Sequence, residues 1–137
     1  MQIDKERVKV ASLQLKTFLQ YIQNAESKEQ LRGYEGEAAS IYFSVFDELI
    51  LQQKKDFFFH GRSKRPPMDN VNAMLSFVYT LLTNQITSAL ESVGLDPCVG
   101  YLHTERPGRA SLALDLIEEF RAVYADSICI IVDLIKK

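Results

Sequence analysis

The sequence predicts an all-α protein, a single helical domain of about five or six helices. Apolar residues recur at spacings of three and four along most of the chain, which is the period of a helix with one buried face. Glycine and proline mark the breaks between these stretches. A chain of 137 residues, 47% hydrophobic and 25% charged, is also long enough and apolar enough to fold as one globular domain.

The first half of the chain is expected to hold two long helices separated by a short helical turn. Residues 4–24 and 35–53 each repeat apolar side chains at helical spacing. Between them, the Ser-Lys-Glu-Gln sequence at 27–30 has the Ser and Gln of a capping box, which predicts a short turn that begins there. Gly33 is expected to end this turn and to break the chain before the second long helix.

The second half is expected to hold a central helix and a later one. After a pair of prolines, Asp69 is a good N-cap, and it predicts an apolar helix over 71–93 that a glycine closes. A connection punctuated by Pro and Gly covers 95–108. A further helix is expected from Arg109 or Ala110 to about residue 126. The apolar residues 127–135 are expected to begin another core element.

Composition excludes several classes of protein. The formal net charge of -2 argues against a protein that coats nucleic acid nonspecifically, because such binding depends on many Lys and Arg contacts to phosphates. Any DNA contact must therefore be local. Cys98 and Cys129 form no zinc cluster or disulfide framework, which favours the reducing cytoplasm. The sequence shows no secretory signal and no apolar stretch long enough to cross a bilayer, so no membrane partner is expected.

A basic loop separates the two halves of the chain. Arg62, Lys64 and Arg65 lie just before the expected start of the central helix, where free backbone N–H groups already favour anions. Such a loop can hold a DNA phosphate. A solvated charged loop is the commoner explanation of this pattern taken alone.

Two residues are candidates for chemistry by their positions. Glu35 lies at the expected start of a helix, where a carboxylate is most often a favourable partner for the helix dipole. His103 lies in the connection before the last expected helix, where a histidine is more often a satisfied loop residue than a ligand. Each residue by itself therefore has a purely structural explanation.

The last expected helix carries a more informative pair of acids. Asp115 and Glu118 are three residues apart, which places their carboxylates on one side of the helix. Like charges so placed repel unless a cation lies between them, and either a hard metal ion or an arginine fits. An imidazole with carboxylates suits manganese and tolerates magnesium. The alternative is that Arg109 or Arg121 pairs with these acids on the surface.

These features resemble the Cas-one integrase family of CRISPR systems. The likeness rests on long blocks of sequence and the spacing between them: LRGYEGEAASIYF at 31–43, GRSKRPPMDNVNAMLSFVYTLL at 61–82 and VGLDPCVGYLHTERPGRASLALDLIEEFR at 93–121. The resemblance implies a helical catalytic domain over residues 1–137 that acts as a metal-dependent DNA endonuclease and integrase in spacer acquisition.

The resemblance also implies a metal site. By position in the matching blocks, Glu35, His103 and Glu118 are the catalytic residues and ligands of magnesium (Mg2+) or manganese (Mn2+). Asp115 is a supporting residue or an alternative ligand. Some members of the family carry Asp where this chain has Glu118, so the choice between Asp115 and Glu118 stays open.

Residues around this site are implied to bind DNA or support the site. Asp69 and Asn72 resemble the family's supporting residues. The implied reaction is phosphoryl transfer, in which a captured fragment end is joined to the repeat array or a branched DNA is cleaved by water. The basic residues expected to contact DNA are Arg62, Lys64, Arg65, Arg106 and Arg109.

The likeness is incomplete. Full members of the family begin with a β-rich domain that builds a homodimer and supports contact with the Cas-two protein, and the present sequence does not resemble that domain. It also stops at residues 131–137, where members continue into further helices. The chain is therefore expected to be a domain fragment, a split gene product or a truncated relic, and to be impaired in integration. The alternative function is a catalytically silent helical module, left by truncation, that binds DNA or serves assembly.

Overall fold

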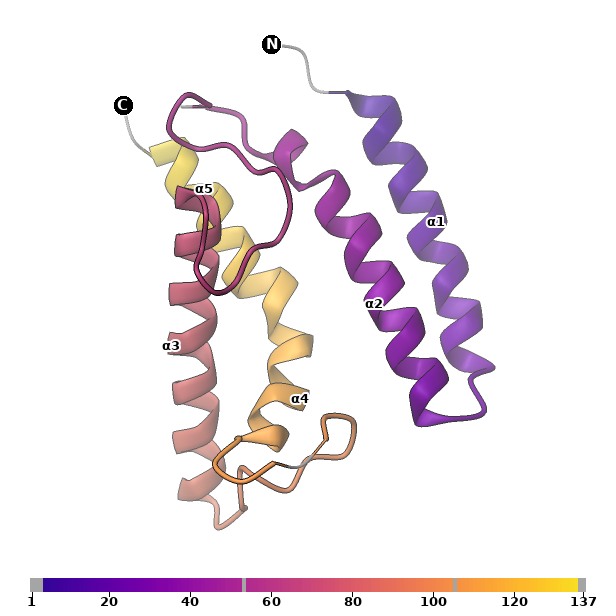
Figure 1. Ribbon diagram of the computed structural model, residues 1–137, viewed down its shortest axis with the longest axis vertical. Coiled ribbons are helices and arrows are strands. Elements are labelled where there is room, and N and C mark those ends of the chain that lie inside the picture. The colour runs from indigo at the N-terminus through magenta and orange to yellow at the C-terminus, as the bar shows by residue number, and fades with distance from the viewer. Residues whose placement is uncertain (1–3, 53, 105, 136–137) are drawn as a thin grey trace. The chain divides into compact units, whose positions relative to one another are not determined.

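The computed structural model of the chain is built of helices joined by loops (Figure 1). It describes residues 4–52, 54–104 and 106–135, with side chains up to residue 131. No strand occurs among these residues, which confirms the all-α class. The chain divides into two compact units, 1–63 and 64–137. In the described part of the chain, no helix has the length and apolar character needed to cross a membrane.

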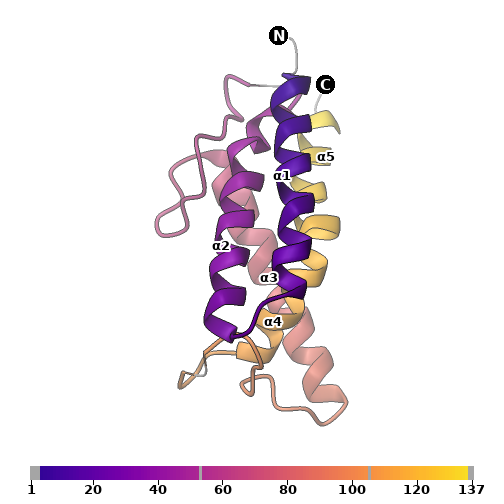
Figure 2. The ribbon, with the colours of Figure 1, turned by 90° about the vertical axis from the view of Figure 1, so that its right-hand side faces the viewer.

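The first unit is a helical hairpin followed by one 3-10 turn. Helix α1 (Lys5–Gln23) and helix α2 (Lys28–Ser44) pack side by side, as Figures 1 and 2 show, and the turn η1 (Phe46–Leu49) follows. The first helix begins where the sequence predicts, because the Asp4 side chain accepts a hydrogen bond of 3.1 Å from the backbone N–H of Arg7.

The predicted capping box starts helix α2. The Ser27 hydroxyl accepts a hydrogen bond of 3.1 Å from the backbone N–H of Gln30. The Gln30 side chain in turn accepts one of 2.9 Å from the backbone N–H of Glu26. Two N–H groups that a helix start leaves unpaired are thereby satisfied.

Helix α2 does not break where the sequence predicts. It runs through Gly33 and ends at Ser44, so the prediction of a new helix that begins at Glu35 is wrong. The predicted end near Gln53 lies outside the described residues. A glycine inside a helix costs only about 1 kcal/mol relative to alanine. Packing of α2 against α1 along its length offsets that cost.

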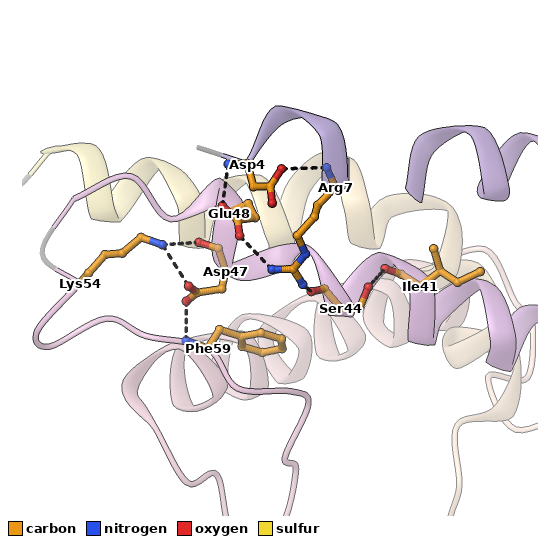
Figure 3. Close-up of polar contacts among 8 residues, drawn as sticks. All are labelled: Asp4, Arg7, Ile41, Ser44, Asp47, Glu48, Lys54 and Phe59. Carbon is orange, nitrogen blue, oxygen red and sulfur yellow. Dashed lines mark hydrogen bonds and ion pairs between the residues drawn. The ribbon is translucent and has the colours of Figure 1, made fainter. Parts of the chain in front are cut away.

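A polar cluster ties the start of α1 to the end of α2 (Figure 3). The Arg7 guanidinium pairs with Glu48 at 3.1 Å and donates to the Ser44 carbonyl at 3.1 Å. The Glu48 carboxylate also accepts the backbone N–H of Asp4 at 3.1 Å. A cation at the carbonyl end of a helix is favoured by the helix dipole, so Arg7 stabilises the end of α2.

The loop after η1 is held by one carboxylate (Figure 3). Asp47 accepts the backbone N–H of Phe59 at 2.8 Å and pairs with the Lys54 ammonium at 3.0 Å. The Phe59 ring is buried beside the rings of Phe43 and Phe46, with centroids 5.7 and 5.1 Å away. The chain before the basic loop is thus part of the first unit's core.

The second unit packs a long helix against a second helical run (Figure 1). Helix α3 (Asn70–Ser92) confirms the predicted central helix, and Gly94 follows it with a φ of 80°. Helix α4 (Ser111–Phe120), the π-helical turn η2 (Arg121–Asp126) and helix α5 (Ser127–Ile135) follow without a loop between them.

The π-helical turn is the main difference from the predicted second unit. The sequence predicts a helix that ends near Asp126 and a separate element after it, whereas the helix continues into α5. The Ser127 hydroxyl donates to the carbonyl of Ala122, five residues earlier, at 3.1 Å. Asp126 is buried and accepts a hydrogen bond of 2.5 Å from the Tyr79 hydroxyl on α3. This bond links the π turn to the neighbouring helix.

Asp69 caps α3 and also binds a buried amide. One carboxylate oxygen accepts the Asn72 backbone N–H at 2.7 Å, and the other accepts the Asn72 side-chain amide at 2.7 Å. Asn72 is fully buried. The pair thus fixes the first turn of the central helix.

We expect Asp69→Ala to lower the free energy of unfolding by about 2 kcal/mol, because α3 loses its cap and a buried amide loses an acceptor. Urea denaturation followed by circular dichroism measures the change. The matched control is Ser27→Ala, which removes an exposed cap from α2 and is expected to cost about 1 kcal/mol. Equal losses for the two variants would contradict the role given to the buried amide.

Candidate functional site

The start of α4 is covered by the connection that precedes it. Ala110 supplies no side-chain cap, so backbone carbonyls satisfy the first N–H groups of the helix. The N–H of Leu112 donates to the Pro97 carbonyl at 2.8 Å. The buried Ser111 hydroxyl donates to the Thr104 carbonyl at 3.2 Å. The connection therefore lies directly against the helix.

Gly100 allows this close approach. A Cβ atom at this position would lie 2.6 Å from the Ser111 Cβ and 3.0 Å from an oxygen of Asp115. No side chain fits in that space. Gly100 was not among the residues singled out from the sequence, although an isolated glycine in a connection is a sign of close backbone contact.

Asp115 organises the connection beyond Gly100. One of its oxygens accepts the backbone N–H groups of Tyr101 and Leu102, at 2.6 and 3.0 Å. The other accepts the backbone N–H of His103 at 2.8 Å. The Asp115 side chain is buried, so three consecutive peptide N–H groups surround an anion that water does not reach.

The same carboxylate orients the His103 ring. Nδ1 of His103 lies 2.7 Å from the second Asp115 oxygen. A carboxylate only accepts hydrogen bonds, so the ring proton lies on Nδ1 and the lone pair lies on Nε2. The His103 side chain keeps 23% of its surface exposed. The ring can therefore present Nε2 to a metal ion or a proton.

Hydrogen bonds decide the charge state of Asp115. Burial alone would raise the pKa of this carboxyl, but the hydrogen bonds from Leu102, His103 and Tyr101 outweigh burial and lower its pKa below the ordinary value of 3.8. The pKa of the Tyr101 hydroxyl is raised by partial desolvation and by the negative charges of Asp115 and Glu119. Asp115 is thus an anion at neutral pH.

Glu118 lies one turn after Asp115 on α4 and has a cationic partner. Its carboxylate pairs with the Arg121 guanidinium at 2.7 Å. The two side chains keep 28% and 24% of their surfaces exposed. Of the two arginines that the sequence offered as partners for these acids, Arg121 is the one this ion pair contains.

Glu35 lies in the other unit. It stands inside α2, half-buried, between Gly33 and Gly36, so the explanation of Glu35 as a dipole partner at a helix start is wrong. Neither unit by itself gathers, among its described residues, three His, Cys, Asp or Glu side chains in a metal-binding arrangement. The predicted set of Glu35, His103 and Glu118 draws on both units.

The basic loop contains the boundary between the units. Arg62 belongs to the first unit, and its guanidinium donates to the Ser63 carbonyl at 2.8 Å. Lys64 and Arg65 begin the second unit and are exposed. Their side chains are accessible to an anion such as a DNA phosphate.

The remaining predicted site residues all lie in the second unit. Arg106 is exposed and Arg109 is half-buried, both in the connection before α4. Asp69 and Asn72, predicted as supporting residues, bond to each other at the start of α3. Their contacts with one another are structural.

Comparison with known proteins gives a consistent result. The family model for CRISPR associated protein Cas1 matches residues 1–137. The CRISPR-associated endonuclease Cas1 1 of Chlorobaculum tepidum is 56% identical over 123 residues, which are 90% of this chain and 36% of that protein. The chain thus spans about a third of the length of this relative.

Two solved structures are similar in fold. A casposase bound to integration product has a TM-score of 0.73 and 34% identity, and the match covers 83% of this chain and 32% of the casposase. A partial Cas6-RT-Cas1–Cas2 complex contains a chain with a TM-score of 0.84 and 28% identity, covering 98% of this chain and 40% of that one.

The lowered pKa of Asp115 predicts a pH-dependent stability. The stability that its ionisation contributes is present above about pH 3.8 and is lost as the pH falls through the lower pKa of the folded state. We expect Asp115→Asn to lower the free energy of unfolding at pH 7 by about 3 kcal/mol. Below pH 4 the free energy of unfolding of the variant should fall less steeply with pH than that of the wild type, as measured by urea denaturation at a series of pH values.

The matched control for this prediction is Asp96→Asn. Asp96 lies in the same connection and accepts the backbone N–H of Cys98 at 2.8 Å, but it is exposed. Its replacement should change stability by less than about 0.5 kcal/mol. An Asp115→Asn protein with the stability and acid profile of the Asp96→Asn protein would contradict the role given to Asp115.

Proposed function

The chain belongs to the Cas1 family of CRISPR associated proteins, and we propose that it acts as part of a metal-dependent DNA endonuclease and integrase in spacer acquisition. The observation that supports this most is His103, whose ring Asp115 orients so that Nε2 carries the lone pair, while Glu118 lies one helical turn after Asp115. The relatives are named as endonucleases, and one structural neighbour is a casposase bound to integration product.

The proposed metal ligands are Glu35, His103 and Glu118. An imidazole nitrogen with carboxylate oxygens fits Mg2+ or Mn2+. Asp115 fits a supporting role better than a ligand role, because both of its oxygens already accept hydrogen bonds. A carboxylate behind a ligating histidine sets the tautomer and raises the basicity of the ring.

In the proposed mechanism the chain positions groups around a phosphodiester. A bound divalent ion supplies electrostatic stabilisation of charge on the phosphoryl oxygens. His103 presents the Nε2 lone pair, and Asp115 stabilises positive charge on the ring through Nδ1. When the attacking group is a fragment's 3′-hydroxyl the product is an integrated strand, and when it is water the product is a cleaved one.

The proposed DNA contacts are local. With a net charge of -2 the chain has no overall attraction for phosphates. A basic set that includes Arg62, Lys64 and Arg65 precedes α3, and Arg106 and Arg109 precede α4. We propose that these side chains bind the backbone of branched DNA, of fragment ends and of the repeat array.

The proposed protein partners belong to the whole protein. A similar chain occurs in a partial Cas6-RT-Cas1–Cas2 complex, which supports Cas2 as a partner here. Homodimer formation and a cytoplasmic location stay predictions. Because the chain spans about a third of the length of the Chlorobaculum tepidum relative and of the casposase, the activity, substrates and partners of the whole protein stay proposals.

A second function is a helical module that binds DNA or serves assembly without chemistry. The division of the proposed ligands between two units favours it, since metal binding then requires the units to be held in one arrangement. Metal binding and turnover distinguish the two functions.

We expect Mn2+ to raise the melting temperature of the chain, because a ligand that binds the folded state stabilises it, by about 2.7 kcal/mol at a hundredfold excess over Kd. The shift should be absent in Glu35→Gln, His103→Ala and Glu118→Gln. Scanning calorimetry with and without Mn2+ measures it. A labelled branched DNA, incubated in parallel, should be cut by the wild-type chain with Mn2+ and remain intact with each variant.

The three variants remove one proposed ligand each. Glu37→Gln is the matched control, because it changes an exposed carboxylate two residues after Glu35 on the same helix. It should keep both the metal response and the cleavage. A metal response without cleavage would favour the silent module, and cleavage by Glu35→Gln at the wild-type rate would overturn the site.

A further inference from the structure

Two carboxylates of helix α4 are followed at the same spacing by a guanidinium at the start of η2. Asp115 and Glu118 are three residues apart on α4, and Arg121, three residues after Glu118, is the first residue of η2. Asp115 is fully engaged with the connection and His103. Glu118 is engaged with Arg121 at 2.7 Å. Glu118 and Arg121 therefore form an ion pair, and each side chain can instead bind another ion of opposite charge.

A divalent cation on Glu118 would compete with Arg121 for the same carboxylate. The two positive charges repel at such short separation, in a partly buried place where screening by water is reduced. A guanidinium displaced from a carboxylate favours another planar or tetrahedral anion, and phosphate accepts its paired N–H groups well. Arg121 would then face the phosphodiester that the cation binds.

We propose that Arg121 is a phosphate-binding residue whose guanidinium stays paired with Glu118 until a divalent cation binds the Glu118 carboxylate. This inference rests on the proposed function and assigns Arg121 a role in it. In the metal-free chain the Arg121 guanidinium is paired with Glu118, and this pairing weakens its binding to phosphate. Metal and DNA therefore strengthen each other's binding, and thermodynamic linkage requires this coupling to be reciprocal.

A purely structural role for the pair predicts something different. Opposite charges three residues apart stabilise a helix slightly whether or not metal is present. Loss of such a pair lowers stability but leaves the affinity for metal and the metal dependence of DNA binding unchanged. The proposal instead requires a single substitution to change these two affinities in opposite directions.

The test is Arg121→Gln in the full chain. Without DNA it should bind Mn2+ roughly three- to tenfold more tightly than wild type, because no guanidinium has to be displaced. The Mn2+ affinity is measured from the electron paramagnetic resonance signal of free Mn2+. Fluorescence anisotropy with a labelled branched DNA should show less than about a twofold effect of the variant in EDTA and roughly tenfold weaker binding in Mn2+.

Two variants serve as controls. Arg7→Gln removes the guanidinium of another Arg–Glu pair, with Glu48 in the first unit (Figure 3), and should change neither affinity. Arg121→Lys keeps the charge but not the planar pair of N–H groups, so it should retain wild-type Mn2+ affinity and recover only part of the DNA affinity. Because the wild-type chain is expected to cut branched DNA in Mn2+, the anisotropy is read at early times at which a denaturing gel shows the probe still uncut.

Each outcome separates the inference from the proposed function. If wild type binds Mn2+ through His103 and Glu118 but Arg121→Gln leaves both affinities unchanged, the inference is wrong and the proposed function stands. If Arg121→Gln weakens DNA binding equally in EDTA and in Mn2+, Arg121 binds DNA without control by Glu118 and the inference is again wrong. If wild type binds no Mn2+, both proposals are overturned.

Discussion

The buried carboxylate of Asp115 is the interaction on which the candidate site depends. Three consecutive peptide N–H groups and the His103 ring converge on it, and their hydrogen bonds outweigh the cost of burial, so the pKa of Asp115 is lowered and the group stays charged. Gly100 is required because the backbone that supplies these donors touches Ser111. One anion thus holds a loop against a helix and orients the His103 ring with its lone pair on Nε2.

The acids after Asp115 along this helical run have other partners. Glu118 lies three residues after Asp115 on α4 and pairs with Arg121, the first residue of the π-helical turn. The buried Asp126 and the Tyr79 hydroxyl connect that turn to α3. Position along one helix therefore decides whether an acid orients a histidine, pairs with an arginine or joins two helices. These roles differ because the surroundings of each carboxylate differ in burial and in available donors.

The division into two units matters for the proposed metal site. Glu35 lies on α2, whereas His103 and Glu118 lie in the second unit. The ion pair of Arg7 with Glu48, and separately the hydrogen bond that Asp47 accepts from Phe59, stabilise the first unit internally. A metal ion with ligands from both units would add binding free energy to one arrangement of them. In that proposal, metal binding and the arrangement of the two units are linked.

The sequence by itself determined the helical class, most helix starts and the candidate site residues. Caps such as Ser27 and Asp69 are local signals, because the acceptor and its N–H donors lie within three residues. Tertiary structure alone decided that Gly33 does not end α2, since packing outweighs a local preference of about 1 kcal/mol. It also decided the partners of Asp115 and Glu118. Hydrogen bonds between a loop and a helix twelve residues apart leave no periodic pattern in the sequence. The sequence likewise allowed Arg109 or Arg121 as the partner of these acids, and the ion pair with Glu118 is formed by Arg121.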